Sequence, residues 1–417
     1  MRAFRRILPA LAVCSLLAGV LMTSGTAAQT TGKNPSHADI LRGFDAAAFW
    51  ASREDVDYGG TYNPTGLVVK WNREIVYRVD GLQFKPDAIE QAIGTLKRQA
   101  GIAGLAVRAA ADGEDANFLI NFRDVATFTM PGGRKAGCYM TTNYDPRSGH
   151  MRLATLNINL SSQGLERCIV HETLHGFGLF NHPHKLHSVL SYYTNAFVFD
   201  LTEPDIVMLQ TLYDPRLKAG ASRLAGLMLA DSIIEEKRRA LNPAAPPKTD
   251  STPVFQAVIA DLEKAAASGN MRAALYLAEA YRFGLGVPKD PARVQTVLDE
   301  AERQATDQDR RFELAYALYG GQYAGKHESR AVALYRRNAE LGHHISQNNL
   351  AVALRDGRGV AQDKREALMW FTIAAVSRNY ELAERNRQGL LAQLTPEDQA
   401  EAEKRAAAWK PAAEAAR

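Results

Sequence analysis

The feature that most restricts the fold of this chain is a repeat in its C-terminal half. Three leucines, Leu277, Leu314 and Leu350, follow one another at intervals of 37 and 36 residues. The same spacing relates three alanines, Ala280, Ala317 and Ala353. A period of this length is typical of helix pairs that stack on their neighbours, because one pair cannot bury its apolar face alone. The sequence therefore predicts an all-α helical-repeat solenoid over residues 255–385.

A glycine-containing turn recurs inside this repeat. Gly284–Asp290 and Gly357–Asp363 both run glycine, one residue, glycine, valine, two residues and aspartate, whereas the middle copy around Gly321 lacks the pattern. These residues resemble Sel-like repeats, short relatives of the tetratricopeptide repeat. The resemblance implies a scaffold that binds a protein or peptide partner. Thr395–Asp398 predicts the capped start of a final helix that closes the array.

A second constraint lies in the N-terminal half, at residues 168–182. His171 and His175 are four residues apart, and Glu172 directly follows the first of them. On a helix both imidazoles then lie on one face, from which they can reach one Zn²⁺ with Glu172 beside them. Gly178 lies where such a helix has to end, since glycine accepts the left-handed backbone that turns the chain back. Half of the ten histidines fall within the seventeen residues 171–187: His171, His175, His182, His184 and His187.

Residues from about 60 to 217 resemble the metzincin metalloproteases, whose signature is H-E-x-x-H-x-x-G-x-x-H followed by a methionine-containing turn. The helix and glycine match, Ser188–Tyr193 looks like the turn, and Leu201–Tyr213 looks like the helix that closes such domains. Asn181 stands at the position of the third histidine, and Leu190 stands where methionine is expected. The chain also looks like an uncharacterised bacterial envelope family related to metzincins. The resemblance implies an α+β metzincin-like domain that uses Zn²⁺ to hydrolyse peptide bonds.

The identity of the third zinc ligand stays open on sequence alone. An amide oxygen is a weaker ligand for Zn²⁺ than imidazole, which counts against Asn181 itself. His182 follows at once, so a shift of the loop by one residue would bring its ring to the metal. His184 and His187 are the further alternatives, and without any third ligand the site would bind metal weakly.

Glu172 is the expected general base, since a carboxylate beside such a metal can take a proton from water and pass it to the leaving amine. By similarity to some metzincins, Tyr192 or Tyr193 would stabilise the oxyanion, although packing at a turn explains either residue as well. Thr202 and Asp205 have the spacing of a helix cap, with Pro204 in the first turn. A glutamate ligand from this helix is the less favoured interpretation.

The N-terminus predicts export. Three arginines precede an apolar stretch, and Thr26–Ala28 suits signal-peptidase cleavage, so residues 1–28 are expected to be a signal peptide and no stable membrane span remains after its removal. Removing Arg2, Arg5 and Arg6 lowers the formal net charge from +4 to about +1. A nearly neutral chain offers no electrostatic basis for binding nucleic acid or an anionic membrane. The expected location is periplasmic or secreted.

Cys138 and Cys168 are the two cysteines of the mature chain. In an oxidising compartment they favour a disulfide between the strand near Tyr139 and the start of the metal helix, with free buried thiols as the alternative. About 390 mature residues indicate two domains. The expected organisation is an extension at 29–59, a metzincin-like zinc peptidase domain at 60–220, a helix and proline-rich linker at 221–254, the repeats at 255–385 and a capping helix at 386–417.

Within the first domain, alternating and helical apolar patterns predict the element order. We expect Leu153–Asn159 to be an edge strand against which an extended peptide could lie. The other expected elements are strands at Leu67–Arg78, Leu105–Ala109, Asn117–Phe122 and Cys138–Thr142, a helix at Pro86–Ala100 and the metal helix from Leu165.

Two functions compatible with these patterns differ in what the first domain does. In one, the chain is an exported zinc-dependent metallopeptidase whose repeats recruit substrates or attach it to an envelope complex. In the other, the metzincin-like domain is catalytically inactive and the chain is an interaction scaffold of the envelope. The intact His171, Glu172 and His175 favour the first, whereas Asn181 and Leu190 favour the second.

Overall fold

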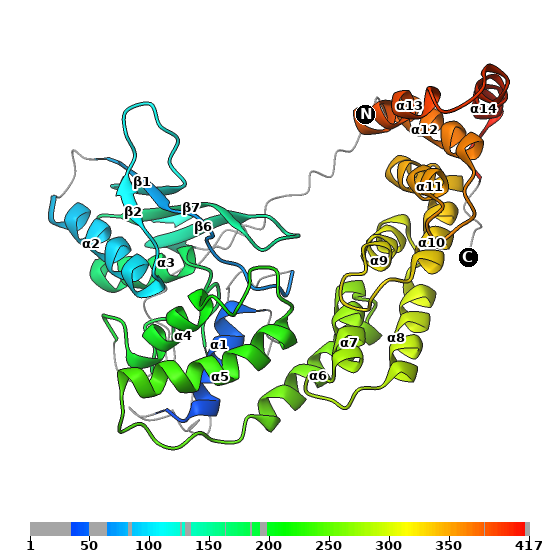
Figure 1. Ribbon diagram of the computed structural model, residues 1–417. Helices are drawn as coiled ribbons and strands as arrows, with labels where there is room; N and C mark the ends of the chain where they lie inside the picture. The colour runs from blue at the N-terminus through cyan, green and yellow to red at the C-terminus, as the bar shows by residue number, and fades with distance from the viewer. Residues whose placement is uncertain are drawn as a thin grey trace. The chain divides into compact units, whose positions relative to one another are not determined.

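The computed structural model describes residues 35–49, 65–81, 86–125, 127–129, 135–162, 164–183, 186–191, 198–378 and 380–412. The chain divides into two compact units, Met1–Val258 and Ile259–Arg417 (Figure 1). The predicted signal peptide, His184, Tyr192 and Tyr193 lie outside the described residues. Of the helices in the described part of the chain, none combines the length and the apolar character that crossing a bilayer requires.

A five-stranded mixed sheet forms the centre of the first unit. Its strands have the order β2-β1-β3-β7-β6, and only the β6–β7 pair is antiparallel. The strands are β1 (Ile75–Asp80), β2 (Val107–Ala109), β3 (Phe118–Arg123), β6 (Cys138–Tyr144) and β7 (Met151–Asn159). A second, two-stranded antiparallel sheet consists of β4 (Phe128–Thr129) and β5 (Lys135–Ala136).

The prediction that Leu153–Asn159 is an edge strand is wrong. This segment is β7, which is hydrogen-bonded to β3 on one side and to β6 on the other. The antiparallel strand β6 is the edge on this side of the sheet. The strand expected at Leu67–Arg78 is also shorter, because Leu67 and Lys70 form only isolated bridges and β1 begins at Ile75.

Helices cover the apolar face of this sheet and form a second layer with one another. Alternate residues of β3, β7 and β6 are buried on one face, where α3 (Leu165–Gly176) packs against β6 and β7. Helix α2 (Pro86–Ala103) packs on α3 through its apolar side. Two further helices pack on this helical layer, α4 (Glu203–Tyr213), which packs on α2, and α5 (Arg223–Leu241), which packs on α4.

The predicted N-terminal extension contains a helix that belongs to the domain core. Helix α1 (His37–Ala48) buries Ile40, Leu41 and Phe44 completely and packs against α4 and α5. Asp45 of α1 also forms a buried two-bond ion pair with Arg223, at 2.7 Å for both nitrogen–oxygen contacts. The apolar spacing of a short helix does not indicate whether the helix lies at the periphery or in the core of a domain. Helix α1 lies in the core.

The proline-rich segment after α5 is held on the first unit by side-chain hydrogen bonds. Ser251 donates to Asp231 of α5, and the Thr249 hydroxyl accepts the backbone N–H of Ala38 at 3.0 Å. Arg238, which is fully buried, donates to the carbonyl of Pro246 at 2.6 Å. These hydrogen bonds attach the segment predicted as a proline-rich linker to the first unit, and it has no regular structure before Thr252.

The second unit is a series of helix pairs, as the repeat predicts. Helix α7 packs on α8, α9 on α10, and α11 on α12, and the leucines and alanines that recur in the sequence are all buried. Helices α13 and α14 both pack on α12, and the Thr395 hydroxyl caps α14 as expected. The bounds are α6 (Thr252–Ala267), α7 (Met271–Phe283), α8 (Pro291–Gln304), α9 (Gln308–Gly320), α10 (Glu328–Glu340), α11 (His344–Asp356), α12 (Lys364–Arg378), α13 (Glu381–Leu391) and α14 (Pro396–Ala408).

The middle repeat keeps the turn geometry without its second glycine. Gly286 and Gly359 have φ values of 69° and 73°, and at the equivalent place Tyr323 has φ 60°. A left-handed backbone costs a non-glycine residue about 1 kcal/mol or more. The Tyr323 ring lies edge-on against Tyr276 with centroids 4.8 Å apart, a contact that helps to offset this cost.

Candidate metal centre

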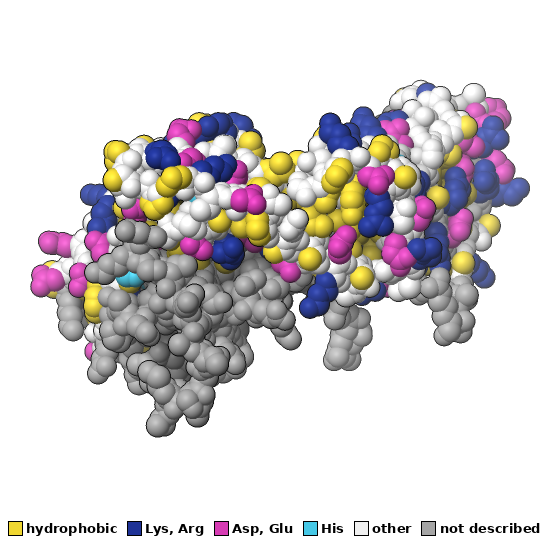
Figure 2. Space-filling model, turned by 90° about the horizontal axis from the view of Figure 1, so that it is seen from below, with side chains coloured by type: hydrophobic (Ala, Val, Ile, Leu, Met, Phe, Trp, Pro, Cys, Tyr) yellow, Lys and Arg dark blue, Asp and Glu magenta, His cyan; other side chains and the backbone are white. Residues whose placement is uncertain are grey.

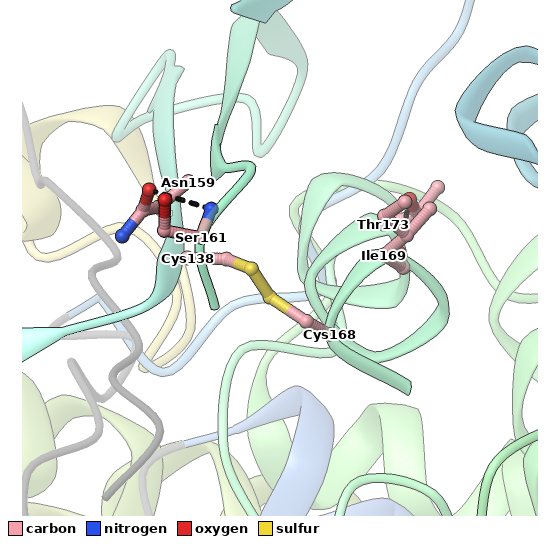
Figure 3. Close-up of a disulfide and its surroundings, with 6 residues drawn as sticks. All are labelled: Cys138, Asn159, Ser161, Cys168, Ile169 and Thr173. Atoms are coloured by element: carbon pink, nitrogen blue, oxygen red, sulfur yellow. Dashed lines mark hydrogen bonds between the residues drawn. A yellow bond between two sulfur atoms is a disulfide. The ribbon is translucent and has the colours of Figure 1, made fainter. Parts of the chain in front are cut away.

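The helix that carries His171 and His175 is buried on every side. All residues of α3 from Cys168 to Gly176 are buried, which places it between the sheet and helix α2. The predicted disulfide between Cys138 and Cys168 is present and joins edge strand β6 to the first turns of α3 (Figure 3). Gly176 faces Phe118 and Met140, where a Cβ would come within 2.9 Å of both, so glycine permits the close packing on the sheet.

The chain turns back directly after α3, and two aromatic side chains hold this turn. The Trp71 indole N–H donates to the Gly176 carbonyl at 2.9 Å, and the Tyr213 hydroxyl donates to the Phe177 carbonyl at 2.9 Å. Gly178 has φ 103°, and a Cβ there would lie 2.2 Å from the Val69 carbonyl oxygen. The predicted break at Gly178 is confirmed, but the hydrogen bonds of Trp71 and Tyr213 to this turn were not predicted.

Three histidine rings converge after this turn. The Nε2 atom of His171 lies 3.1 Å from Nε2 of His175 and 3.1 Å from Nε2 of His182. One nitrogen from each ring lies within 4.8 Å of the other two, and no other group of three or more metal-binding side chains occurs among the described residues. The three rings are at most 1% exposed.

Backbone carbonyls fix the tautomers of the two α3 histidines. His171 Nδ1 lies 2.9 Å from the Val189 oxygen, and His175 Nδ1 contacts the Leu179 oxygen. A carbonyl only accepts hydrogen bonds, so each neutral ring carries its proton on Nδ1 and presents a bare Nε2 to the cluster. A histidine that donates its other ring N–H to a carbonyl is the arrangement found around protein-bound metals.

Asp205 holds the loop that supplies the Val189 carbonyl. Its carboxylate accepts the N–H groups of Val189 at 3.0 Å and Thr202 at 2.9 Å, and also the hydroxyl groups of Ser188 and Thr202. The predicted capping box of α4 is therefore confirmed. The same carboxylate also ties the start of α4 to the turn beneath His171, and this second role was not predicted.

The alternative ligands occupy other positions. The Asn181 amide donates to the Phe49 carbonyl at 3.1 Å, and its backbone N–H donates to the Ala47 carbonyl at 3.1 Å. Asn181 is thus directed to the end of α1, whereas His182 is directed to the histidines of α3. His187 is not part of the three-histidine group, and Leu190 is fully buried in the turn.

Burial determines the protonation of this cluster. Desolvation lowers the pKa of His175 to about 4. It also lowers the pKa values of His171 and His182 well below the ordinary range, and the neighbouring histidines and Arg167 lower them further. All three rings are therefore neutral at pH 7, which is the form that binds metals.

Glu172 is fully buried next to His171, and desolvation raises its pKa well above the usual value for a carboxyl group. The backbone amide of Met140 on β6 opposes this rise. Neither carboxyl oxygen has a hydrogen bond of good geometry with the described residues. A buried carboxyl group with a raised pKa can hold a proton near neutral pH and release it to a neighbouring group.

The three imidazoles form a donor set that could hold a metal ion. Two nitrogens that each lie about 2.0–2.1 Å from a tetrahedral zinc are separated by about 3.3–3.4 Å. Two of the three nitrogen pairs, His171 with His175 and His171 with His182, are 3.1 Å apart, close to this value, and the third pair lies within 4.8 Å. The bare Nε2 atoms of His171 and His175 face each other at 3.1 Å and repel unless a cation lies between them, so the chemistry of these residues is compatible with a bound metal.

Two family models match parts of the chain. Residues 39–225 match a family described as "Protein of unknown function (DUF2927)". Residues 272–293, 311–343 and 344–375 match the Sel1 repeat, so the second unit carries Sel1 repeats. No match was found among curated proteins.

Two crystal structures are similar to this chain. A Sel1 repeat protein from Oxalobacter formigenes is 26% identical, with 31% of this chain and 97% of that chain covered and a TM-score of 0.23. A protective antigen from uropathogenic Escherichia coli that displays an SLR fold is 18% identical, with a TM-score of 0.24. That match covers 58% of this chain and 52% of the antigen, so the chain spans about half of the antigen's length.

Proposed function

We propose that this chain is an exported zinc-dependent metallopeptidase whose Sel1 repeats bind a protein partner. The observation that carries the proposal is the convergence of three neutral imidazole nitrogens, from His171, His175 and His182, on a buried helix and loop, with the buried Glu172 next to His171 in the same helix. Three protein ligands leave one position of a tetrahedral zinc open, which is the pattern of catalytic sites, whereas structural sites use four. The Sel1 repeats support protein–protein interaction.

Metal binding and proton transfer would fall to different residues of the site. His171, His175 and His182 would hold the zinc, and the carbonyls of Val189 and Leu179 keep two of these rings in the metal-binding tautomer. When bound, zinc polarises a peptide carbonyl and lowers the pKa of water to about 7. Glu172 in its ionised form would accept a proton from the attacking water at its carboxylate and deliver it to the amine that leaves.

Export is part of the proposal. The Cys138–Cys168 disulfide supports it, since such bonds persist in oxidising compartments. The arginines and apolar stretch of residues 1–28 point in the same direction. A periplasmic or secreted location would also place the repeats among envelope or extracellular proteins.

Burial of the cluster favours a second candidate function. His171, Glu172, His175 and His182 are at most 1% exposed, and a peptidase has to admit a peptide to its metal. In the second candidate, the first unit binds zinc without catalysis and the chain acts as an envelope scaffold through its repeats. The two candidates share the metal site and differ in hydrolysis.

Two measurements test these candidates, first of metal content and then of peptidase activity. Elemental analysis of the chain from residue 29 onward should find about one zinc per molecule, and His171→Ala and His182→Ala should each lose it. Asn181→Ala is the comparison variant and should keep zinc, because its side chain contacts Phe49 instead of the histidines and its backbone N–H still joins the loop to Ala47. Zinc lost in Asn181→Ala but kept in His182→Ala would assign the third ligand to Asn181.

Hydrolysis is then measured on a library of internally quenched peptides. Glu172→Gln should retain zinc and lose at least about a hundredfold in rate, which is the contribution expected of a general base. Activity in Glu172→Gln equal to that of the native chain would refute the peptidase proposal. A zinc-loaded native chain without any cleavage would support the scaffold function instead.

A further inference from the structure

The end of the repeat array contains a polar hollow that no part of the proposed zinc chemistry uses. It has a volume of about 500 Å³ and lies among the end of α11, the turn before α12, the start of α12 and one side of α13. Its lining includes Arg355, Gln362, Lys364, Arg385, Asn386 and Gln393. All of these residues belong to the second unit, so the hollow is independent of the metal centre.

The charges of this hollow do not balance. Three basic side chains line it against one acidic side chain, Asp356, and that carboxylate is paired with Arg355 at 2.7 Å. Lys364 and Arg385 form no ion pair with any of the described residues. Elsewhere on the array arginines are usually paired, as Arg330 is with Asp299 and Glu302. Two unneutralised cations therefore face one small space, which favours an acidic ligand.

The amide side chains in the lining distinguish a peptide from a phosphate backbone. Gln362, Asn386 and Gln393 each donate an amide N–H within the chain, to Arg355, Asn348 and Gly389 respectively. The amide oxygen of each residue remains as an acceptor. A peptide offers backbone N–H groups to such acceptors, whereas the phosphates and sugars of DNA offer none.

Other features of the hollow also disfavour nucleic acid. Its lining contains no aromatic side chain on which a base could stack, and two cations are few compared with the phosphate contacts of nucleic-acid-binding proteins. On the face shown in Figure 2, acidic and basic side chains are interspersed instead of forming a continuous basic surface. We infer that this hollow binds an acidic peptide segment of a protein partner, with Lys364 and Arg385 receiving its carboxylates.

A second hollow on the same array provides the control. It has a volume of about 610 Å³ and is lined by Asp299, Glu302, Arg303, Ala305 and Arg337, so its two acidic and two basic side chains balance. Arg337 is exposed there, like Arg385 in the first hollow. Reversal of its charge changes the net charge of the array without touching the proposed site.

The test uses fluorescein-labelled hexaglutamate as the probe and the chain from residue 29 onward, with binding followed by fluorescence anisotropy at about 50 mM salt. Hexaglutamate should bind, uncharged hexaglutamine should bind much more weakly, and the double variant Lys364→Glu, Arg385→Glu should lose about tenfold or more in affinity. Arg337→Glu should retain the native affinity within about twofold. Thermal unfolding should show both variants folded, since the substituted side chains are not buried.

Three results would overturn the inference. They are an absence of hexaglutamate binding to the native chain, an equal affinity in the native chain and the Lys364→Glu, Arg385→Glu variant, and an equal loss in the Arg337→Glu control. A labelled oligothymidylate is measured in parallel. If it binds as tightly as hexaglutamate and loses affinity in the same double variant, the hollow is a general anion site and the peptide assignment fails. None of these binding measurements depends on whether the first unit holds zinc.

Discussion

Asp205 should control both the stability of the first unit and its affinity for zinc. Its buried carboxylate accepts two backbone N–H groups, from Val189 and Thr202, and two hydroxyl groups. Val189 in turn accepts the Nδ1 proton of His171 through its carbonyl. Removing the carboxylate therefore leaves buried donors unsatisfied and loosens the loop that orients a proposed zinc ligand.

The expected magnitude follows from these contacts. Each buried donor left without a partner costs about 1–3 kcal/mol, and loss of the helix cap costs about 1 kcal/mol. Because the same donors contribute to both terms, we expect Asp205→Ala to lower the free energy of unfolding by about 3–5 kcal/mol. Loss of a residue that supports a metal ligand typically weakens metal binding about 10- to 100-fold.

The chain offers a matched control in Asp39. This residue is the third residue of α1, as Asp205 is of α4, and it completes a capping box by accepting the N–H and the hydroxyl of Ser36. Asp39 has no contact with the histidine cluster. Asp39→Ala should therefore cost only about 1 kcal/mol of stability and leave zinc affinity unchanged.

Urea unfolding of the zinc-free protein and competition with a chromophoric zinc chelator measure the two effects separately. Asp205→Asn keeps the volume and one acceptor oxygen, so it should fall between Asp205→Ala and the native chain in both assays. It also keeps the zinc measurement possible if Asp205→Ala does not fold. Asp205 and Asp39 variants that are equal in stability and in zinc affinity would refute this reasoning.

Two further perturbations address the turn after α3 and the charge of the cluster. Gly178→Ala should lower the free energy of unfolding by more than about 2 kcal/mol and weaken zinc binding, because its Cβ would lie 2.2 Å from the Val69 oxygen at φ 103°. Gly94 lies in the middle of α2 with open space around it, so Gly94→Ala should raise the free energy of unfolding by about 0.5–1 kcal/mol. Urea unfolding of both variants checks this contrast. Zinc-free protein should lose stability as the pH falls from about 6.5 to about 4. The pKa of His175 is about 4 in the folded protein and 6.5 ordinarily, so in this pH range the unfolded chain binds more protons than the folded chain. His175→Gln should flatten this pH dependence, and an unchanged slope would contradict it.

The parts of the fold that depend on local spacing could be predicted. His171 and His175 share a helical face by their separation of four residues, and α2, α4 and α14 follow from apolar spacing and capping residues. The solenoid follows from the repeat in the same way, since each helix pair mainly contacts its neighbours in sequence.

The parts that could not be predicted concern which segments lie next to one another in the fold, because local sequence patterns do not determine this. The alternation in Leu153–Asn159 is the same for an edge strand and an inner strand, so the position of β7 between β3 and β6 could not be read from it. The composition of residues 242–253 predicted a linker, but it does not indicate that Asp231 and Arg238 of α5 anchor Ser251 and Pro246. Trp71 and Tyr213, which hold the turn after α3, are more than thirty residues from it in sequence and carry no motif.

Contacts with α1 explain why Asn181 stands where the metzincin pattern has histidine. A metzincin pattern expects histidine at this position, and its absence alone suggests a disabled site. In the structure Asn181 instead uses its amide and its backbone N–H to join the loop to the end of α1, at Phe49 and Ala47. This anchor leaves the next residue, His182, facing His171 and His175. The loop therefore supplies an imidazole one position later than the pattern requires. It is held there by α1, which lies in the segment predicted as an N-terminal extension and is a buried part of the domain.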